Sequence, residues 1–190
     1  MVPKMVFILP LCVLFCCACS TGTVPKPYGY VRIAIPDTAY QSYKTKVPYT
    51  FALSRNANVV RHTSPSERYW IDIVYPSLRT TIHGSYHPIH GDLDMLSNDA
   101  FKLVYKHAGQ ATAIPEQPFA NPEARVYGML FALEGNVASP FQFFVTDSVH
   151  HFFRGSVYCD CTPNADSLAP IYDYIEKDVR HLIETWQWQN

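Results

Sequence analysis

Charged residues are scarce in this chain, and no segment concentrates charge of one sign. Lysine and arginine together number 15, and aspartate and glutamate 16, so the net charge is -1. A protein that binds nucleic acid or an anionic membrane surface through long-range attraction needs a field of positive charge. The composition therefore argues against a nucleic-acid partner.

Cysteine is almost absent from the body of the chain, because only Cys159 and Cys161 lie beyond the first 19 residues. On a strand these side chains would point to the same face, where a bridge between them would be badly strained. A metal would need two further ligands, and no spacing in the sequence supplies them. We therefore expect two small core or surface residues without a disulfide, and we expect no metal and no cofactor.

The longest apolar run lies at the N-terminus and is too short to cross a bilayer comfortably. Residues 5–18 are almost wholly apolar and follow a single charge, Lys4, whereas a membrane-spanning helix needs about 20 apolar residues. A short basic segment followed by such a run is typical of a signal peptide. An uncleaved membrane anchor is the alternative.

The end of this run resembles the cleavage site of a lipoprotein signal. Ala18 supplies the small residue that precedes the modified cysteine, although Cys16 stands where leucine is usual. We therefore predict a signal peptide over 1–18, lipid on Cys19, a lipidated tether over 19–27 and one domain over 28–190. Each buried methylene of the acyl chains would contribute about 0.8 kcal/mol to membrane anchoring.

Alternating apolar residues predict a mainly antiparallel sheet. We expect a loop over 115–122 and strands over 28–35, 49–53, 57–62, 69–75, 79–86, 124–133, 141–146 and 152–159. Turn sequences join the last three strands, which should form a meander with apolar residues on both faces. Apolar residues at helical spacing predict helices over 93–111 and from Asp166 or Ser167 to Trp186. The predicted fold class is α+β, with a helix on each side of the sheet.

Histidines gather at His83, His87 and His90, and two aspartates follow them. Imidazoles can bind zinc. However, His83 and His87 would lie about 13 Å apart on a strand that rises roughly 3.3 Å per residue. That separation is too great for one ion, so we favour exposed histidines over a metal site.

A serine hydrolase would need a nucleophile, a base and an acid, and the candidates are Ser139 or Ser148, His150 or His151, and Asp147. The sequence has no Gly-x-Ser-x-Gly elbow. Aspartate and serine are also favoured in hairpin turns, where their side chains bond to the backbone. We therefore predict a turn at Asp147 and no catalytic residues. An envelope hydrolase or metal-dependent enzyme using the region of His83, Ser139 and Asp147 remains the alternative.

Arg154 shares a predicted strand face with aromatic residues. It could form a buried ion pair with Asp173 or Glu184 on the last helix, or it could contact a partner, and both interpretations stay open. Lys106 and His107 lie near the end of the first predicted helix, where cations face the negative end of the helix dipole.

Seven short stretches carry a family resemblance: 25–30 (PKPYGY), 81–83 (TIH), 105–107 (YKH), 138–144 (ASPFQFF), 146–148 (TDS), 153–156 (FRGS) and 181–185 (HLIET). In their order and spacing they resemble the gliding motility lipoprotein GldD family of Bacteroidetes. The order of the elements is also similar to that of the PsbP/Mog1-like α-β-α sandwich.

The resemblance implies an envelope lipoprotein that supports gliding motility and type IX secretion, in a family whose motifs assign no molecular role. We therefore expect a non-catalytic protein, lipid-anchored and facing the periplasm, whose partners are the membrane and envelope proteins of that machinery. A ligand-binding lipoprotein with a deep aromatic pocket is a third alternative. The candidates for partner contact or a structural polar role are His83, Tyr105, Lys106, His107, Asp147, Arg154 and Glu184.

Overall fold

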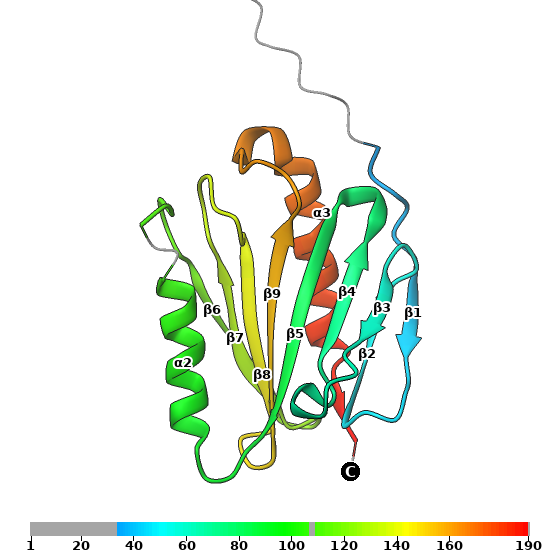
Figure 1. The fold of residues 1–190 in the computed structure, drawn as a ribbon, viewed down its shortest axis with the longest axis vertical. Helices are drawn as coiled ribbons and strands as arrows, with labels where there is room; N and C mark the ends of the chain where they lie inside the picture. The colour runs from blue at the N-terminus through cyan, green and yellow to red at the C-terminus, as the bar shows by residue number, and fades with distance from the viewer. Residues whose placement is uncertain (1–33, 107–108, 190) are drawn as a thin grey trace, which may run out of the picture. The chain divides into compact units, whose positions relative to one another are not determined.

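An antiparallel sheet of seven strands organises the computed structural model, which describes residues 34–106 and 109–189 (Figure 1). These residues belong to the second of the two units into which the chain divides, Arg32–Asn190. The strand order is β3-β4-β5-β9-β8-β7-β6. The strands are β3 (Asn58–Arg61), β4 (Ile71–Tyr75), β5 (Thr80–Pro88), β6 (Glu116–Asn121), β7 (Val126–Ala132), β8 (Phe141–Thr146) and β9 (His151–Cys159).

A second sheet has three strands in the order β1-β2-β10. They are β1 (Tyr40–Tyr43), β2 (Tyr49–Ser54) and β10 (Gln187–Trp188). Short helical turns lie at Pro65–Glu67, before β4, and at Pro76–Leu78, between β4 and β5. Each strand pair in both sheets is antiparallel.

Two α-helices complete the fold, α2 (Leu93–Tyr105) and α3 (Ala165–Glu184). The α3 helix begins after Asn164, whose side chain accepts a hydrogen bond of 3.1 Å from the backbone of Ser167. The cap predicted at Asp166 or Ser167 was therefore placed too late. The predicted apolar stripe is confirmed, because α3 buries Leu168, Ile171, Ile175, Val179, Leu182 and Ile183. Among the described residues, no helix combines the length and apolar character needed to cross a membrane.

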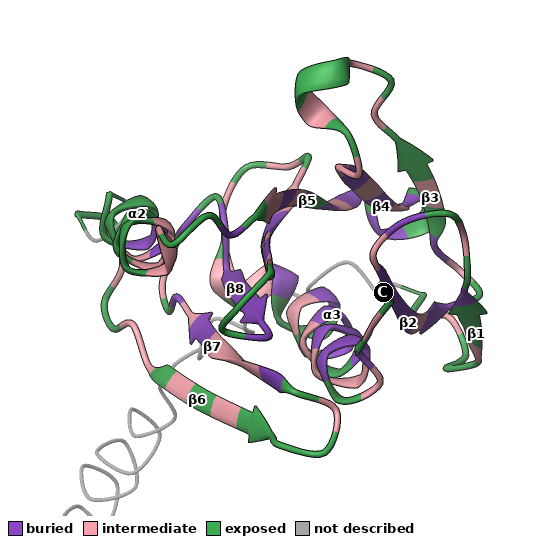
Figure 2. Ribbon diagram, turned by 90° about the horizontal axis from the view of Figure 1, so that it is seen from below, coloured by how far each residue is buried: buried purple, intermediate pink, exposed green. Residues whose placement is uncertain are grey.

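The seven-stranded sheet has an apolar core on each face. Successive side chains of a strand point to opposite faces, so Val126 and Leu130 of β7 join the core under α3, whereas Phe131 joins the core under α2. Figure 1 shows α3 behind β5 and β9, and Figure 2 shows purple, buried segments where the strands meet the two helices. The predicted α+β class, with a helix on each side of a mainly antiparallel sheet, is confirmed.

Two facing glycines make room for aromatic rings in the core under α3. Gly84 of β5 lies opposite Gly155 of β9. A Cβ atom at Gly155 would overlap the ring of Phe143, and one at Gly84 would overlap the ring of Phe153. The absence of side chains at this glycine pair therefore allows the two phenylalanines to lie against the backbone of the sheet.

Most predicted strands are confirmed, and the differences lie at short or polar elements. Residues 116–121, predicted as a loop, form the edge strand β6, where Pro118 is tolerated because an edge strand has an unpaired side. The four-residue β1 and the two-residue β10 were not predicted. The strand expected over 28–35 lies mostly outside the described residues, and its described end, Ala34–Ile35, is not in a strand.

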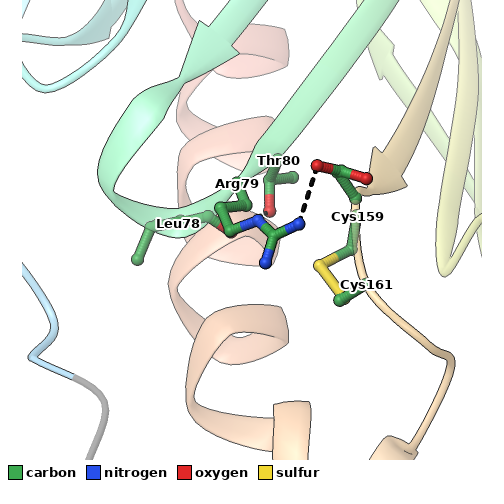
Figure 3. The surroundings of a disulfide bond; sticks show 6 residues. Leu78, Arg79, Thr80, Cys159 and Cys161 are labelled. Atoms are coloured by element: carbon green, nitrogen blue, oxygen red, sulfur yellow. Dashed lines mark hydrogen bonds and ion pairs between the residues drawn. A yellow bond between two sulfur atoms is a disulfide. The ribbon is translucent and has the colours of Figure 1, made fainter.

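The prediction of two unlinked cysteines is wrong, because Cys159 and Cys161 form a disulfide (Figure 3). That prediction assumed a strand through both residues, but β9 ends at Cys159 and the chain then bends. The bend brings the two Cα atoms to 5.4 Å, within the usual disulfide range. It also lets Asp160 form an ion pair of 2.9 Å with Arg79, and the Asp160 N–H donates to the Arg79 carbonyl at 2.8 Å.

Candidate functional site

A groove of about 450 Å³ opens on the α2 side of the sheet. Its floor is formed by β5 and β9, and α2, which packs against β8 and β9, forms one wall. His62 and Trp70, at the two ends of the β3–β4 connection, and Asp72 of β4 line the other side. In Figure 2, α2 and the β3–β4 connection lie on either side of β5. Polar and charged side chains line this concave surface together with apolar ones.

The α2 wall of the groove is mainly apolar. Leu96, Ala100 and Leu103 recur at helical spacing and therefore share one face of the helix. Leu103 leaves 43% of its surface exposed, which is high for a leucine on a helix that packs against a sheet. Asp99 also lies on this wall, where its carboxylate pairs with Lys102 at 2.9 Å.

Polar residues form a row across the floor. Asp72 of β4 lies opposite His83 of β5, His83 opposite Ser156 of β9, and Ser156 opposite Gln142 of β8. Directly opposite residues of paired strands project to the same face. The register of four strands therefore brings together side chains that are as much as 84 positions apart, from 72 to 156, in the sequence.

Asp72 binds two histidines with its two carboxylate oxygens. Its Oδ1 lies 2.8 Å from Nδ1 of His83, and its Oδ2 lies 3.1 Å from Nε2 of His62. Nδ1 of His62 lies 2.9 Å from Oε2 of Glu67. The hydrogen bond to Glu67 raises the pKa of His62 above its ordinary value of 6.5, and Asp72 adds to the rise against the opposing effect of burial. The network therefore holds the β3–β4 connection against β4 and β5 along one side of the groove.

Arg154 lies in the same groove and has no carboxylate partner among the described residues. Its guanidinium Nη2 donates a hydrogen bond of 2.6 Å to the side-chain oxygen of Gln142. Burial lowers the pKa of Arg154 below its ordinary value. Of the two interpretations left open for Arg154, the ion pair with Asp173 or Glu184 is wrong, because Arg154 faces the α2 side of β9 and α3 packs against the other face.

The structure does not bring together Ser139 and Asp147, two residues of the alternative hydrolase prediction. Ser139 precedes β8 and Asp147 follows it, so the two lie at opposite ends of a six-residue strand. Ser139 is fully buried, and Oδ1 of Asp147 accepts backbone hydrogen bonds of 3.0, 2.8 and 2.8 Å from residues 149, 150 and 151. The predicted turn at Asp147 is confirmed.

The comparison with protein families decides where this fold belongs. A model of the family described as gliding motility lipoprotein GldD matches residues 20–188. The chain belongs to this family. The resemblance seen in the short sequence stretches is thereby confirmed, and the match includes both helices and each of the strands named above.

Two further comparisons add little to the GldD family assignment. No curated protein matches the chain. A solution structure of cyanobacterial PsbP (CyanoP) from Synechocystis is similar with a TM-score of 0.46 and 12% sequence identity. The similarity covers 85% of this chain and 99% of that one. At this level it carries no argument about function.

Of the candidate residues that the structure describes, two line the groove, His83 and Arg154. Tyr105 ends α2, leaves 48% of its surface exposed and donates a hydrogen bond to Glu116. Lys106 follows as the exposed cap residue of α2, and His107 lies outside the described residues. Glu184 is exposed at the end of α3, on the other face of the sheet.

The other two histidines of the predicted cluster have separate roles. His87 is partly buried in the groove with its ring edge-on to Trp70, at 5.6 Å between ring centroids, and burial lowers its pKa. His90 is exposed, and its backbone N–H donates a hydrogen bond of 2.8 Å to Oδ1 of Asp92. Within the described ranges, no three His, Cys, Asp or Glu side chains are placed to share a metal ion.

The sequence analysis did not predict His62, Trp70 and Asp72, which line the groove, or Gln142, which accepts a hydrogen bond from Arg154. Each is brought to the site by strand pairing or by the β3–β4 connection. The sequence contains one weak indication, because His83, Ser85 and His87 alternate as polar positions along β5 while Ile82, Gly84 and Tyr86 are buried. A polar face on a strand in the middle of a sheet indicates a surface that no helix covers.

Proposed function

We propose that this protein is a lipid-anchored envelope protein, facing the periplasm, that supports gliding motility and type IX secretion through contacts with other proteins. Membership of the GldD family carries the proposal. The family is described as a lipoprotein family, which supports lipid attachment at the predicted residue, Cys19.

The disulfide supports the periplasmic location. Disulfides form and persist in oxidising compartments such as the bacterial periplasm, and they are rare in the cytosol. The bond between Cys159 and Cys161 lies at the partly exposed end of β9, where a reducing compartment would have access to it.

The state of the polar side chains favours binding over catalysis. Both oxygens of Asp72 are held by imidazoles, and Asp147 is held by backbone amides. Ser156 lies beside His83 in the polar row, but the hydrogen bonds of the described residues include none between these two side chains. A serine nucleophile needs such contact with its base.

Complementation of a strain that lacks the gene tests the proposal. Wild-type protein should restore gliding and the release of secreted proteins, whereas Cys19→Ala should abolish lipid attachment and restore neither. Ser139→Ala, Ser148→Ala and Ser156→Ala should restore both, because no serine acts as a nucleophile. Loss of function in Ser156→Ala, with the protein present and folded, would contradict the non-catalytic role.

Affinity capture of the anchored protein tests the protein contacts. Wild-type protein solubilised from membranes should recover envelope proteins of the motility and secretion machinery. The matched control is Cys19→Ala, which should recover fewer of them because it is no longer concentrated at the membrane. Recovery of none by the wild type would contradict the proposal.

A further inference from the structure

The groove contains a cation whose hydrogen-bonding groups are mostly unused. A guanidinium has five N–H donors in a planar fork, and the hydrogen bond from Arg154 to Gln142 uses one of them. The Nε2 group of Gln142 is also buried, and it has no hydrogen-bond partner in the described structure. Buried donors are normally satisfied. Arg154 therefore presents unused donors in the groove, beside a buried Gln142 amide whose N–H groups have no partner in the described structure.

The carboxylates of the groove are not available to Arg154. Asp72 is engaged by His62 and His83, and Asp99 is paired with Lys102. The remaining polar groups that line the groove near Arg154 are the hydroxyls of Ser85 and Ser156 and the ring of His87. A partly buried arginine without an anion is expensive to desolvate unless a ligand supplies the negative charge.

The rest of the lining is apolar and could contact the body of such a ligand. Leu96, Ala100 and Leu103 lie on the α2 side, Phe152 lies on the floor, and Trp70 lies on the opposite side. The indole N–H of Trp70 is already bonded to the Tyr86 carbonyl at 3.0 Å. Trp70 therefore has only its ring carbons to offer a ligand.

We propose that this groove binds a small organic anion, in which a carboxylate or phosphate group contacts Arg154 and an apolar body lies between Trp70 and α2. Sites for small molecules are typically concave, largely apolar and about 300–1,000 Å³ in volume, with a few convergent polar groups. The groove, at about 450 Å³, has each of these properties. The site goes beyond the proposed protein contacts and does not depend on them.

Titration of the ¹⁵N-labelled full chain in a nonionic detergent tests the site. Heptanoate, hexyl phosphate and 1-hexanol have the same hexyl chain and differ only in the head group. The two anions should shift the NMR signals of the Trp70 indole and the Arg154 Nε–H group saturably, with at least about tenfold tighter binding than 1-hexanol. The tighter of the two anions identifies the carboxylate or the phosphate as the preferred group.

Two groove variants and one control make the test specific. Arg154→Gln should reduce anion binding to the level of 1-hexanol, and Leu103→Glu should weaken it at an exposed position where the fold is not affected. The control Arg180→Gln, on the α3 side, removes an arginine that is paired with Glu176 at 2.6 Å and should leave binding unchanged. Anion binding no tighter than that of 1-hexanol in the wild type, or undiminished in both groove variants, would overturn the proposal.

Discussion

The carboxylate of Asp72 and the imidazole of His83 face each other across the β4–β5 pair, with 2.8 Å between Oδ1 and Nδ1. The other oxygen of Asp72 contacts His62, which in turn contacts Glu67. These contacts link the segment between β3 and β4 to strand β5, which carries His83. The geometry of one wall of the groove therefore depends on the charge of His62.

His62 should remain protonated to a higher pH than an ordinary histidine. Its pKa is raised above 6.5 by Glu67, with burial opposing and Asp72 adding to the rise. Because the pKa is higher in the folded state, the stabilisation is full below about pH 6.5 and is lost as the pH rises through the folded-state pKa. NMR titration should show a lower His62 pKa in Glu67→Gln and no change in the control Glu123→Gln. The same pKa in the wild type and Glu67→Gln would contradict the assignment.

Replacement of Asp147 by alanine should destabilise the fold by roughly 2–3 kcal/mol, because three backbone N–H groups lose a charged acceptor. Burial opposes ionisation, but these hydrogen bonds lower the pKa of Asp147 below 3.8. Its stabilisation is therefore present above about pH 3.9 and is lost as the pH falls through the folded-state pKa. Urea unfolding at pH 7 should show a smaller loss in Asp147→Asn, which keeps the acceptor oxygen.

The matched control for Asp147 is His150→Ala. The His150 side chain is 69% exposed and lies 3.6 Å from the same carboxylate, so its removal should change the free energy of unfolding little. An effect of Asp147→Ala as small as that of His150→Ala would show that the turn does not depend on the carboxylate.

Gly155→Ala should destabilise the protein by about 1–3 kcal/mol through overpacking. The added methyl group would overlap the ring of Phe143, which is almost fully buried and can therefore move only by displacing its neighbours. Gly109→Ala is the control, because nothing lies within 4 Å of a Cβ atom there. Thermal unfolding should show a lower Tm for Gly155→Ala alone. Equal Tm values would mean that the aromatic core adapts to the extra methyl group.

Cys159 and Cys161 should resist alkylation in the protein isolated from cells. Intact mass spectrometry after iodoacetamide treatment should detect no label on these residues without a reductant and two labels after reduction. Labelling of both cysteines before reduction would contradict the disulfide and remove its support for a periplasmic location.

The sequence predicts elements whose periodicity is strong and local. The meander β7–β9 and the buried stripe of α3 follow from such patterns. Edge strand β6 was missed because its residues alternate weakly and include Pro118, which is more common in loops. The cysteine prediction failed because it depended on the residue at which β9 ends.

The groove depends on information that is not local. His83 and Arg154 were recognised as candidates, but their partners Asp72 and Gln142 are fixed by the register of three strand pairs. The ion pair between Arg154 and a carboxylate of α3, one of two interpretations left open, fails for the same reason. Alternation indicates that Arg154 and Phe153 lie on opposite faces, but it does not indicate which face α3 covers.

Photo-crosslinking in living cells tests the central claim, that exposed surfaces of an anchored protein contact other envelope proteins. A photoreactive amino acid would replace one exposed apolar residue at a time, at Val60, Met95, Leu103, Tyr105 or Val149. Mass spectrometry should identify adducts with proteins of the gliding and type IX secretion machinery from at least one position, and these adducts should disappear in Cys19→Ala. Cells that glide normally and yet yield no such adduct from any of the five positions would contradict the account.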